Sequence, residues 1–148
     1  MKSKKVLMVA ITLILSAMLF AAGSSESQSV KSYVFGSDCT WPPFEYVDEK
    51  GDIVGFEIDL VAEIAKRAGV VITHKNVAWD GIFAGLTNGA YDGIASGVTV
   101  TAERKQSMDF STPFLQVTQA IIVNKGSESL KNAASLVGKR IGVQLGTT

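Results

Sequence analysis

The sequence has little of what metal centres, disulfide frameworks and nucleophilic active sites need. Its 148 residues include one cysteine and one histidine. These numbers exclude an intramolecular disulfide, a cysteine-based zinc site and a multi-histidine metal or haem pair. A Ser-His-Asp or Cys-His set would have to use His74, which lies in a predicted strand away from the candidate loops. No glycine-rich phosphate-binding pattern occurs either, so we expect no cofactor and no bound metal.

An excess of charge of one sign is also missing, because 14 Lys and Arg balance 14 Asp and Glu. Lys2, Lys4 and Lys5 precede a long apolar run, and removal of the first 23 residues would leave 11 basic and 14 acidic groups, a net charge of −3. Such a chain lacks the basic surface of a nucleic-acid binder, so we expect no nucleic-acid partner. With 47% hydrophobic and 19% charged residues, it has the composition of a folded protein.

Residues 1–23 have the pattern of a secretory signal peptide. Basic residues precede an uncharged run at 6–22, and small residues follow it. We expect cleavage after Gly23; the alternative is an uncleaved N-terminal anchor, since the apolar run is just short of a comfortable membrane span. Cys39 lies too far beyond the run for lipid attachment. We therefore expect a non-lipidated periplasmic or extracellular protein, with a polar tether at 24–31.

From residue 32 the expected elements alternate between strand and helix. Strands are predicted at 32–37, 70–77 and 91–95, with a small hairpin around 46–54. Helices are predicted at 57–68, at 80–87 and from Thr101, a plausible N-cap. The first helix is the clearest, with apolar residues at helical spacing and Gly69 as its stop. This order predicts an α/β fold with a mainly parallel sheet and helices on both faces.

The pattern weakens beyond residue 108. A strand is predicted at 116–123, a weak helix at 129–137 and another strand at 140–144. The sequence ends in Gly146-Thr147-Thr148, a turn typical of the start of a helix. We therefore expect a truncated sequence; the alternative is a final strand that ends at the surface.

Ligands of open α/β sheets bind beyond the carboxyl ends of the strands. This rule selects the loops 38–44, 77–79, 96–104 and 146–148. Arg104 follows Ser96, Gly97 and Thr99, and its planar, permanently charged guanidinium suits a carboxylate. The aromatic side chains of Trp41, Phe44 and Trp79 also lie on these loops.

Each of these residues alone also has a purely structural interpretation. The tryptophans could be half-buried packing residues, and Arg104 could be a solvated helix residue. Glu57 lies at a helix start, where a solvated or capping role is the default. Cys39 is expected to be a small buried residue, and His74 to be structural or exposed.

Five segments, in this order, resemble the family 3 extracellular solute-binding proteins, the periplasmic amino-acid receptors of ABC importers. The clearest is the run GFEIDL at 55–60. The others are SDCTWPPFE at 37–45, SGVTVTAER at 96–104, FSTPF at 110–114, and GKRIGV at 138–143 with the final Gly-Thr-Thr. The resemblance covers about residues 32–148.

The resemblance implies a type II periplasmic-binding-protein clamshell with lobe 1 complete and lobe 2 only begun. Lobe 1 would span 32–119, and the hinge crossover and the start of lobe 2 would span 120–148. It implies that Arg104 binds the α-carboxylate of an amino acid and that aromatic side chains line the side-chain pocket. The acid that binds the α-ammonium would lie beyond Thr148. The expected ligand-binding residues are Asp38, Trp41, Trp79, Ser96, Gly97, Thr99, Arg104, Thr147 and Thr148.

We therefore expect a monomeric binding protein without catalysis that delivers an amino acid to the membrane permease of an ABC transporter. Two tryptophan faces and Asp38 favour a basic or polar side chain. One alternative is an enzyme on the same scaffold, a dehydratase of prephenate-like acids, which would need an acid or base over the ligand. Another is a ligand-sensing domain of a larger receptor, which a catalytic or transmembrane segment downstream would reveal.

Overall fold

The computed structural model describes residues 29–127 and 129–148. The chain divides into two units, Met1–Val30 and Lys31–Thr148. The expected signal peptide and most of the tether lie outside the described residues. Within the described ranges, no helix has both the length and the apolar character that a membrane crossing requires.

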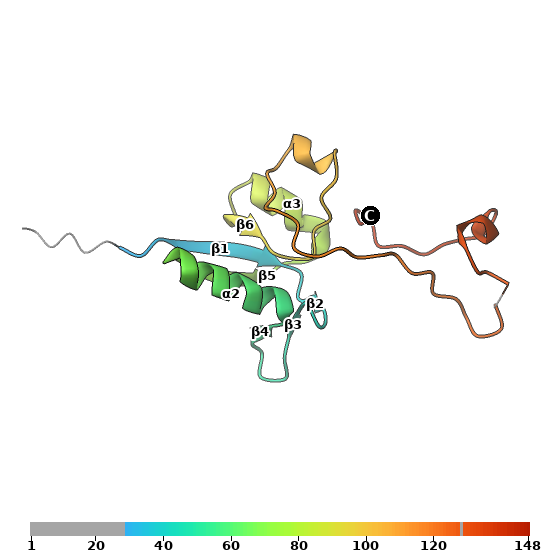
Figure 1. Ribbon diagram of the computed structural model, residues 1–148, viewed down its shortest axis with the longest axis horizontal. Coiled ribbons are helices and arrows are strands. Elements are labelled where there is room, and N and C mark those ends of the chain that lie inside the picture. Colours follow the sequence, from blue (N-terminus) through green and yellow to red (C-terminus); the bar gives the residue numbers. More distant parts are fainter. Residues whose placement is uncertain (1–28, 128) are drawn as a thin grey trace, which may run out of the picture. The chain divides into compact units, whose positions relative to one another are not determined.

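A parallel three-stranded sheet carries the site described below. Its central strand β1 (Ser32–Ser37) pairs with β5 (Val71–Asn76) on one side and with β6 (Gly93–Ile94) on the other (Figure 1). Parallel neighbours need crossover connections, which places a helix after β1 and another after β5. All three predicted strands are therefore confirmed, although β6 is shorter than expected.

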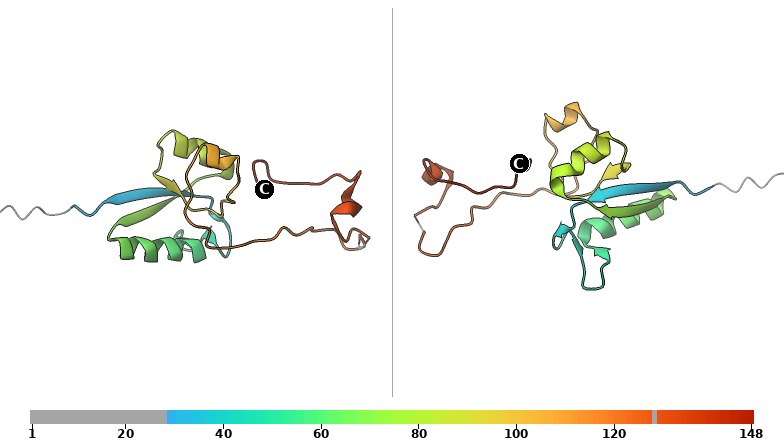
Figure 2. Two further views of the ribbon diagram at one scale, coloured as in Figure 1. Left: turned by 45° about the horizontal axis from the view of Figure 1, so that its top comes forward. Right: turned by 180° about the vertical axis from the view of Figure 1, so that it is seen from behind.

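Two α-helices lie on opposite sides of this sheet, as Figures 1 and 2 show. The helix α2 (Phe56–Ala68) buries Val61 and Ala65, and α3 (Trp79–Thr87) buries Ile82 completely. Both helices begin one residue earlier than predicted. The predicted stop of α2 is confirmed, because Gly69 takes a left-handed conformation with φ of 68° that glycine adopts without steric cost.

The segment between β1 and α2 forms a small antiparallel sheet in the order β2-β3-β4. Its strands are β2 (Thr40–Trp41), β3 (Glu45–Val47) and β4 (Ile53–Val54). The pair β3–β4 is the predicted hairpin. The backbone N–H groups of Phe56 and Glu57 donate to the carbonyls of Pro43 and Phe44, which joins the start of α2 to this loop.

The predicted third α-helix is wrong in type. A 3₁₀ helix, η1 (Arg104–Gln106), stands in its place. Its N-cap residue is Glu103 and not the predicted Thr101, although Thr101 Oγ1 accepts a hydrogen bond of 3.1 Å from the N–H of Arg104. Most side chains of this segment are exposed, so no buried apolar face extends the helix beyond its first turn.

The predictions for the last forty residues are mostly wrong. The segments 116–123 and 140–144 are not strands, and the expected helix at 129–137 is reduced to the 3₁₀ helix η2 (Ala133–Leu136). The side chains of both expected strands are exposed, and neither has a partner strand in the part of the chain that the structure describes. Without a partner, the backbone groups of a strand have no ladder to join.

Candidate functional site

The candidate site lies where the three parallel strands end. Asp38 directly follows β1, Trp79 begins α3 just after β5, and Ser96 lies two residues beyond β6. The N–H of Asp38 donates a 2.8 Å hydrogen bond to Ser96 Oγ, although the two residues are 58 positions apart. The fold thus brings the first and third of these loops into direct contact.

Arg104 is held by two carbonyl oxygens and two aromatic rings. Its Nη1 donates to the carbonyl of Thr99 at 2.9 Å, and its Nη2 to that of Gly146 at 2.8 Å. The guanidinium carbon lies 4.9 Å from the ring centroid of Phe83 and 5.7 Å from that of Trp79, both within cation–π range. A guanidinium has five N–H donors and these bonds use two, so donors remain for a carboxylate.

The final turn approaches Arg104 and Thr99. The hydroxyls of Thr99 and Thr148 are 2.9 Å apart, and Gln119 Nε2 donates to the carbonyl of Thr148 at 2.8 Å. The Thr147 hydroxyl bonds within the turn, to the carbonyl of Gln144. Of the two predicted threonines in this turn, Thr148 therefore contacts another predicted site residue, Thr99, directly.

A hollow of about 460 Å³ lies beside Asp38 and Trp79. Asp38 is only 4% exposed, and its Oδ1 accepts a 2.9 Å hydrogen bond from the Thr40 hydroxyl. Trp79 also lines the hollow, and its Nε1 is buried without a hydrogen-bond partner in the described residues. The lining residues are Asp38, Thr40, Asn76, Ala78, Trp79, Asp80 and Gln144.

Two acidic residues, Asp38 and Asp80, and the Trp79 side chain therefore line a space of the size that small-molecule sites have. Arg104 lies on the same indole ring. Anionic and cationic groups thus lie around one aromatic side chain, as the recognition of a zwitterion requires.

Trp41 stands apart from this arrangement. It pairs with Glu45 in the β2–β3 ladder and is 50% exposed, and it is not among the residues that line the hollow.

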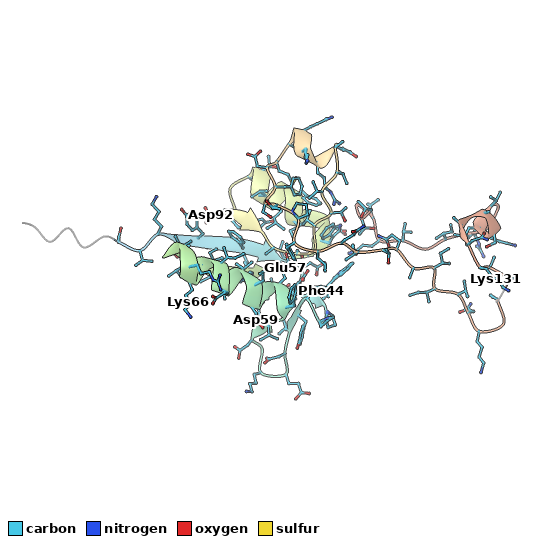
Figure 3. All side chains as sticks on the ribbon, in the orientation of Figure 1. Phe44, Glu57, Asp59, Lys66, Asp92 and Lys131 are labelled. Carbon is cyan, nitrogen blue, oxygen red and sulfur yellow. The ribbon has the colours of Figure 1, made fainter. Side chains whose placement is uncertain are left out.

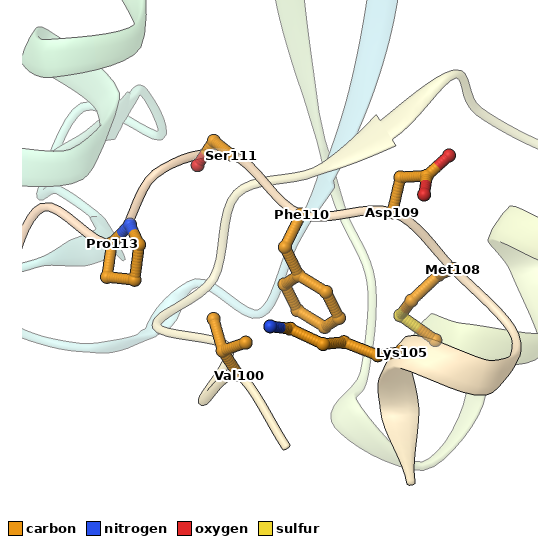
Figure 4. Close-up of a pocket in the computed structure, with 7 residues that line it drawn as sticks. All are labelled: Val100, Lys105, Met108, Asp109, Phe110, Ser111 and Pro113. Carbon is orange, nitrogen blue, oxygen red and sulfur yellow. The ribbon is translucent and has the colours of Figure 1, made fainter. Parts of the chain in front are cut away.

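A second hollow, of about 290 Å³, lies around Lys105, Phe110 and Asp109 (Figure 4). None of the nine predicted site residues lines it. We therefore assign the site to the first hollow.

Sequence reasoning missed two buried acids next to the site. Glu45 is 1% exposed and Glu57 is 5% exposed. Figure 3 shows Glu57 at the N-terminal end of α2, beside Phe44. Burial, with the neighbouring Glu57 carboxyl as second cause, raises the pKa of Glu45 to about 8. Burial also raises the pKa of Glu57, against the lowering effect of hydrogen bonds from Gly97, Glu45 and Ser96.

The expected solvated or capping role of Glu57 is therefore wrong. Its Oε2 accepts a 2.8 Å hydrogen bond from the N–H of Gly97. A signal was available in the sequence, because Glu57 shares a helical face with the buried residues Val61 and Ala65, four and eight positions on. Phe83, beneath Arg104, was also missed.

Cys39 and His74, the two remaining residues considered in the sequence, make contacts within the fold. Cys39 is buried at 6% exposure, as expected, and burial raises the pKa of its thiol. His74 Nδ1 lies 2.9 Å from Ser37 Oγ, and burial lowers its pKa. In the described ranges, no group of three or more His, Cys, Asp and Glu residues could hold a metal ion.

Comparison with known proteins identifies the class. The model of the bacterial extracellular solute-binding proteins, family 3, matches residues 33–144. The chain belongs to this family, as its motifs indicated, and it has the α/β fold of the type II periplasmic binding proteins, of which it forms one lobe. The family is one of solute-binding proteins, and the relatives named below are amino-acid-binding proteins, so neither comparison supports the dehydratase alternative. Its members are extracellular or periplasmic.

Individual relatives are amino-acid-binding proteins. The chain is 39% identical to a probable histidine-binding protein of Neisseria gonorrhoeae over 118 residues, 80% of this chain and 44% of the relative. It resembles a solved ancestral arginine-binding protein bound to arginine, with 45% identity and a TM-score of 0.73, over 78% of this chain and 51% of that one. The chain spans about half the length of the curated relatives it matches.

A third relative consists of one domain. It is the arginine-bound form of domain 1 from TmArgBP, with 43% identity and a TM-score of 0.53, over 56% of this chain and 66% of that one.

Proposed function

We propose that the protein is an extracytoplasmic receptor that captures an amino acid, preferably one with a basic or polar side chain, and delivers it to the permease of an ABC importer. One observation carries this proposal: Arg104 lies over the ring of Trp79, and the buried Asp38 lines the hollow beside the same ring. Charges of both signs around one indole match the charges of an amino acid.

In this proposal Arg104 binds the α-carboxylate through donors not used by the Thr99 and Gly146 carbonyls. Ser96, Gly97, Thr99 and the turn with Thr147 and Thr148 assist it. Asp38 and Trp79 receive the side chain, a cation being favoured by the carboxylate and the indole face.

We keep Trp41 as a predicted residue of the pocket that receives the ligand's side chain.

The relatives support a basic ligand. Those compared above are described as histidine-binding or arginine-bound. The single-domain relative bears on the lobe itself, because an arginine-bound domain 1 supports binding by groups of one lobe, which is where Asp38, Trp79 and Arg104 lie.

Substitution of Arg104 tests the proposal. We expect Arg104→Ala to weaken binding of L-arginine by at least about 100-fold, because the α-carboxylate would lose its proposed charged, hydrogen-bonding partner, a loss of about 3 kcal/mol. Titration calorimetry with L-arginine, L-histidine, L-glutamine and L-alanine measures both affinity and preference. Arg67→Ala, whose side chain is 78% exposed on α2, is the matched control and should bind as the unmodified protein does. Unchanged affinity in Arg104→Ala would contradict the proposal, and a preference for L-alanine would contradict the basic ligand.

Export and organisation complete the proposal. Residues 1–23 direct export and are cleaved, the mature protein carries no lipid, and residues 24–31 form a tether. Lobe 1 spans 32–119, and 120–148 are the crossover and the start of lobe 2. The protein acts as a monomer.

A further inference from the structure

Three acids lie buried next to the proposed site, and they come from three different segments. Asp38 follows β1, Glu45 begins β3, and Glu57 lies in the first turn of α2; their exposures are 4%, 1% and 5%. Acidic residues are almost never fully buried without a partner. In the described residues the only ion pairs are those of Glu63 with its basic neighbours on α2, so no cation neutralises these three acids.

Two of the acids hold adjacent residues of one loop. Glu57 Oε2 accepts the N–H of Gly97 at 2.8 Å, and Glu45 Oε1 accepts the Ser96 hydroxyl at 3.1 Å. The same Ser96 oxygen accepts the N–H of Asp38. The conformation of the Ser96–Gly97 loop, and its link to Asp38, therefore depends on these two carboxyl groups.

The two carboxyl groups also face each other. Glu45 and Glu57 are within hydrogen-bond reach, while Glu45 Oε2 is buried and has no donor among the described residues. A proton on Glu45 supplies the missing partner, because a protonated carboxyl donates where a carboxylate only accepts. The other titratable groups that face Glu45 are Asp38 and the Cys39 thiol, and neither supplies a positive charge.

We propose that Glu45 and Glu57 are positioning residues of the ligand site, and that one proton shared between them holds the Ser96–Gly97 loop in its binding conformation. This inference rests on the proposed function. Loss of the proton would leave two carboxylates side by side in a buried place, and their repulsion would pull the Gly97 and Ser96 contacts apart. The pKa of about 8 for Glu45 places this loss at mildly alkaline pH.

The first test follows the loop without ligand. In the full chain, we expect the Gly97 amide resonance to shift with pH and to report a midpoint near pH 8. In Glu45→Gln the amide always donates to Glu57, so the shift should disappear. A Gly97 resonance that does not move between about pH 6.5 and pH 9 in the unmodified protein overturns the inference. Because this measurement uses the unmodified protein, it is decisive even if a variant fails to fold.

The second test measures L-arginine affinity over the same range. The affinity of the unmodified protein should fall about fivefold or more between about pH 6.5 and pH 9, whereas the affinity of Glu45→Gln should change by less than about twofold over the same range. Glu57→Gln keeps an oxygen for the Gly97 N–H and should behave like Glu45→Gln. Glu49→Gln on the same hairpin and Asp59→Asn on the same helix are exposed controls, and they should keep the pH dependence of the unmodified protein.

The two tests separate failure of this inference from failure of the proposed function. If the Gly97 resonance shifts with pH but no amino acid binds, the loop depends on the proton but the proposed function is wrong. The ligand-positioning role assigned to the two glutamates is then wrong as well. If L-arginine binds and affinity changes equally in the unmodified protein and in Glu45→Gln, the receptor function stands and the shared proton has no role in it.

Discussion

Ser96 serves two other segments with a single hydroxyl group. It donates to Glu45 and accepts from the Asp38 N–H, and it is 5% exposed. A threonine or serine that only begins a turn would be replaceable, whereas this one satisfies two buried groups. Its importance comes from contacts with residues 51 and 58 positions away, which no local pattern contains.

We therefore expect Ser96→Ala to lower the free energy of unfolding by about 1–3 kcal/mol, because a buried donor and a buried acceptor both lose their partner. Urea denaturation measures the change. Ser111→Ala removes a hydroxyl from an exposed residue and should change the stability by less than about 0.5 kcal/mol. Equal effects of the two substitutions would mean that the Ser96 network contributes nothing to stability.

At the scale of elements, α3 contributes to both the core and the site. Ile82 of this helix is fully buried at 0% exposure, while the rings of Trp79 and Phe83 lie against the Arg104 guanidinium. Packing of Ile82 thus fixes the helix that positions the aromatic rings.

Truncation of this side chain tests its packing role. We expect Ile82→Ala to destabilise the protein by about 2–5 kcal/mol through the loss of buried contacts and the cavity left behind. Ile64→Ala on α2, where the isoleucine is 53% exposed, should cost about 0.5 kcal/mol or less. Thermal and urea unfolding compare the two, and a similar loss in both would place Ile82 outside the core.

The sequence predicted the elements that local rules define, namely β1, α2, the hairpin and α3. Helical spacing and Gly69 define α2 without help from the rest of the chain. The segments 116–123 and 140–144 have strand composition, yet a strand also needs a neighbour, and sequence composition does not supply one. The positions of Glu45 and Phe83 in the site likewise depend on contacts across loops, so single-residue reasoning did not find them.

At the scale of the whole molecule, the buried acids make stability depend on pH. The raised pKa of Glu45, about 8 against an ordinary 4.5, means that the folded state retains a proton that the unfolded state loses. The contribution of this proton to stability is therefore fully present below about pH 4.5 and is lost as the pH rises through 8. The lowered pKa of His74 acts in the opposite direction, but only below its ordinary value of 6.5.

The clearest window therefore lies between about pH 6.5 and pH 8, where we expect the free energy of unfolding to fall with rising pH by up to about 1.4 kcal/mol per unit. Urea denaturation at several pH values measures the slope. In Glu45→Gln the slope should flatten, because the shared proton is no longer titrated. Stability that rises with pH over this window in the unmodified protein would contradict the assignment of a retained proton.

The stacking of Arg104 on Trp79 has an optical consequence. The chain has two tryptophans; the indole nitrogen of Trp79 is buried and its ring lies under a cation, while Trp41 is half exposed. Indole emission is sensitive to nearby charge and to water, so the two rings emit under different conditions. Pairing of the guanidinium with an incoming carboxylate would alter the electric field on the Trp79 ring only, so the chain contains an intrinsic fluorophore in contact with the residue proposed to bind the ligand.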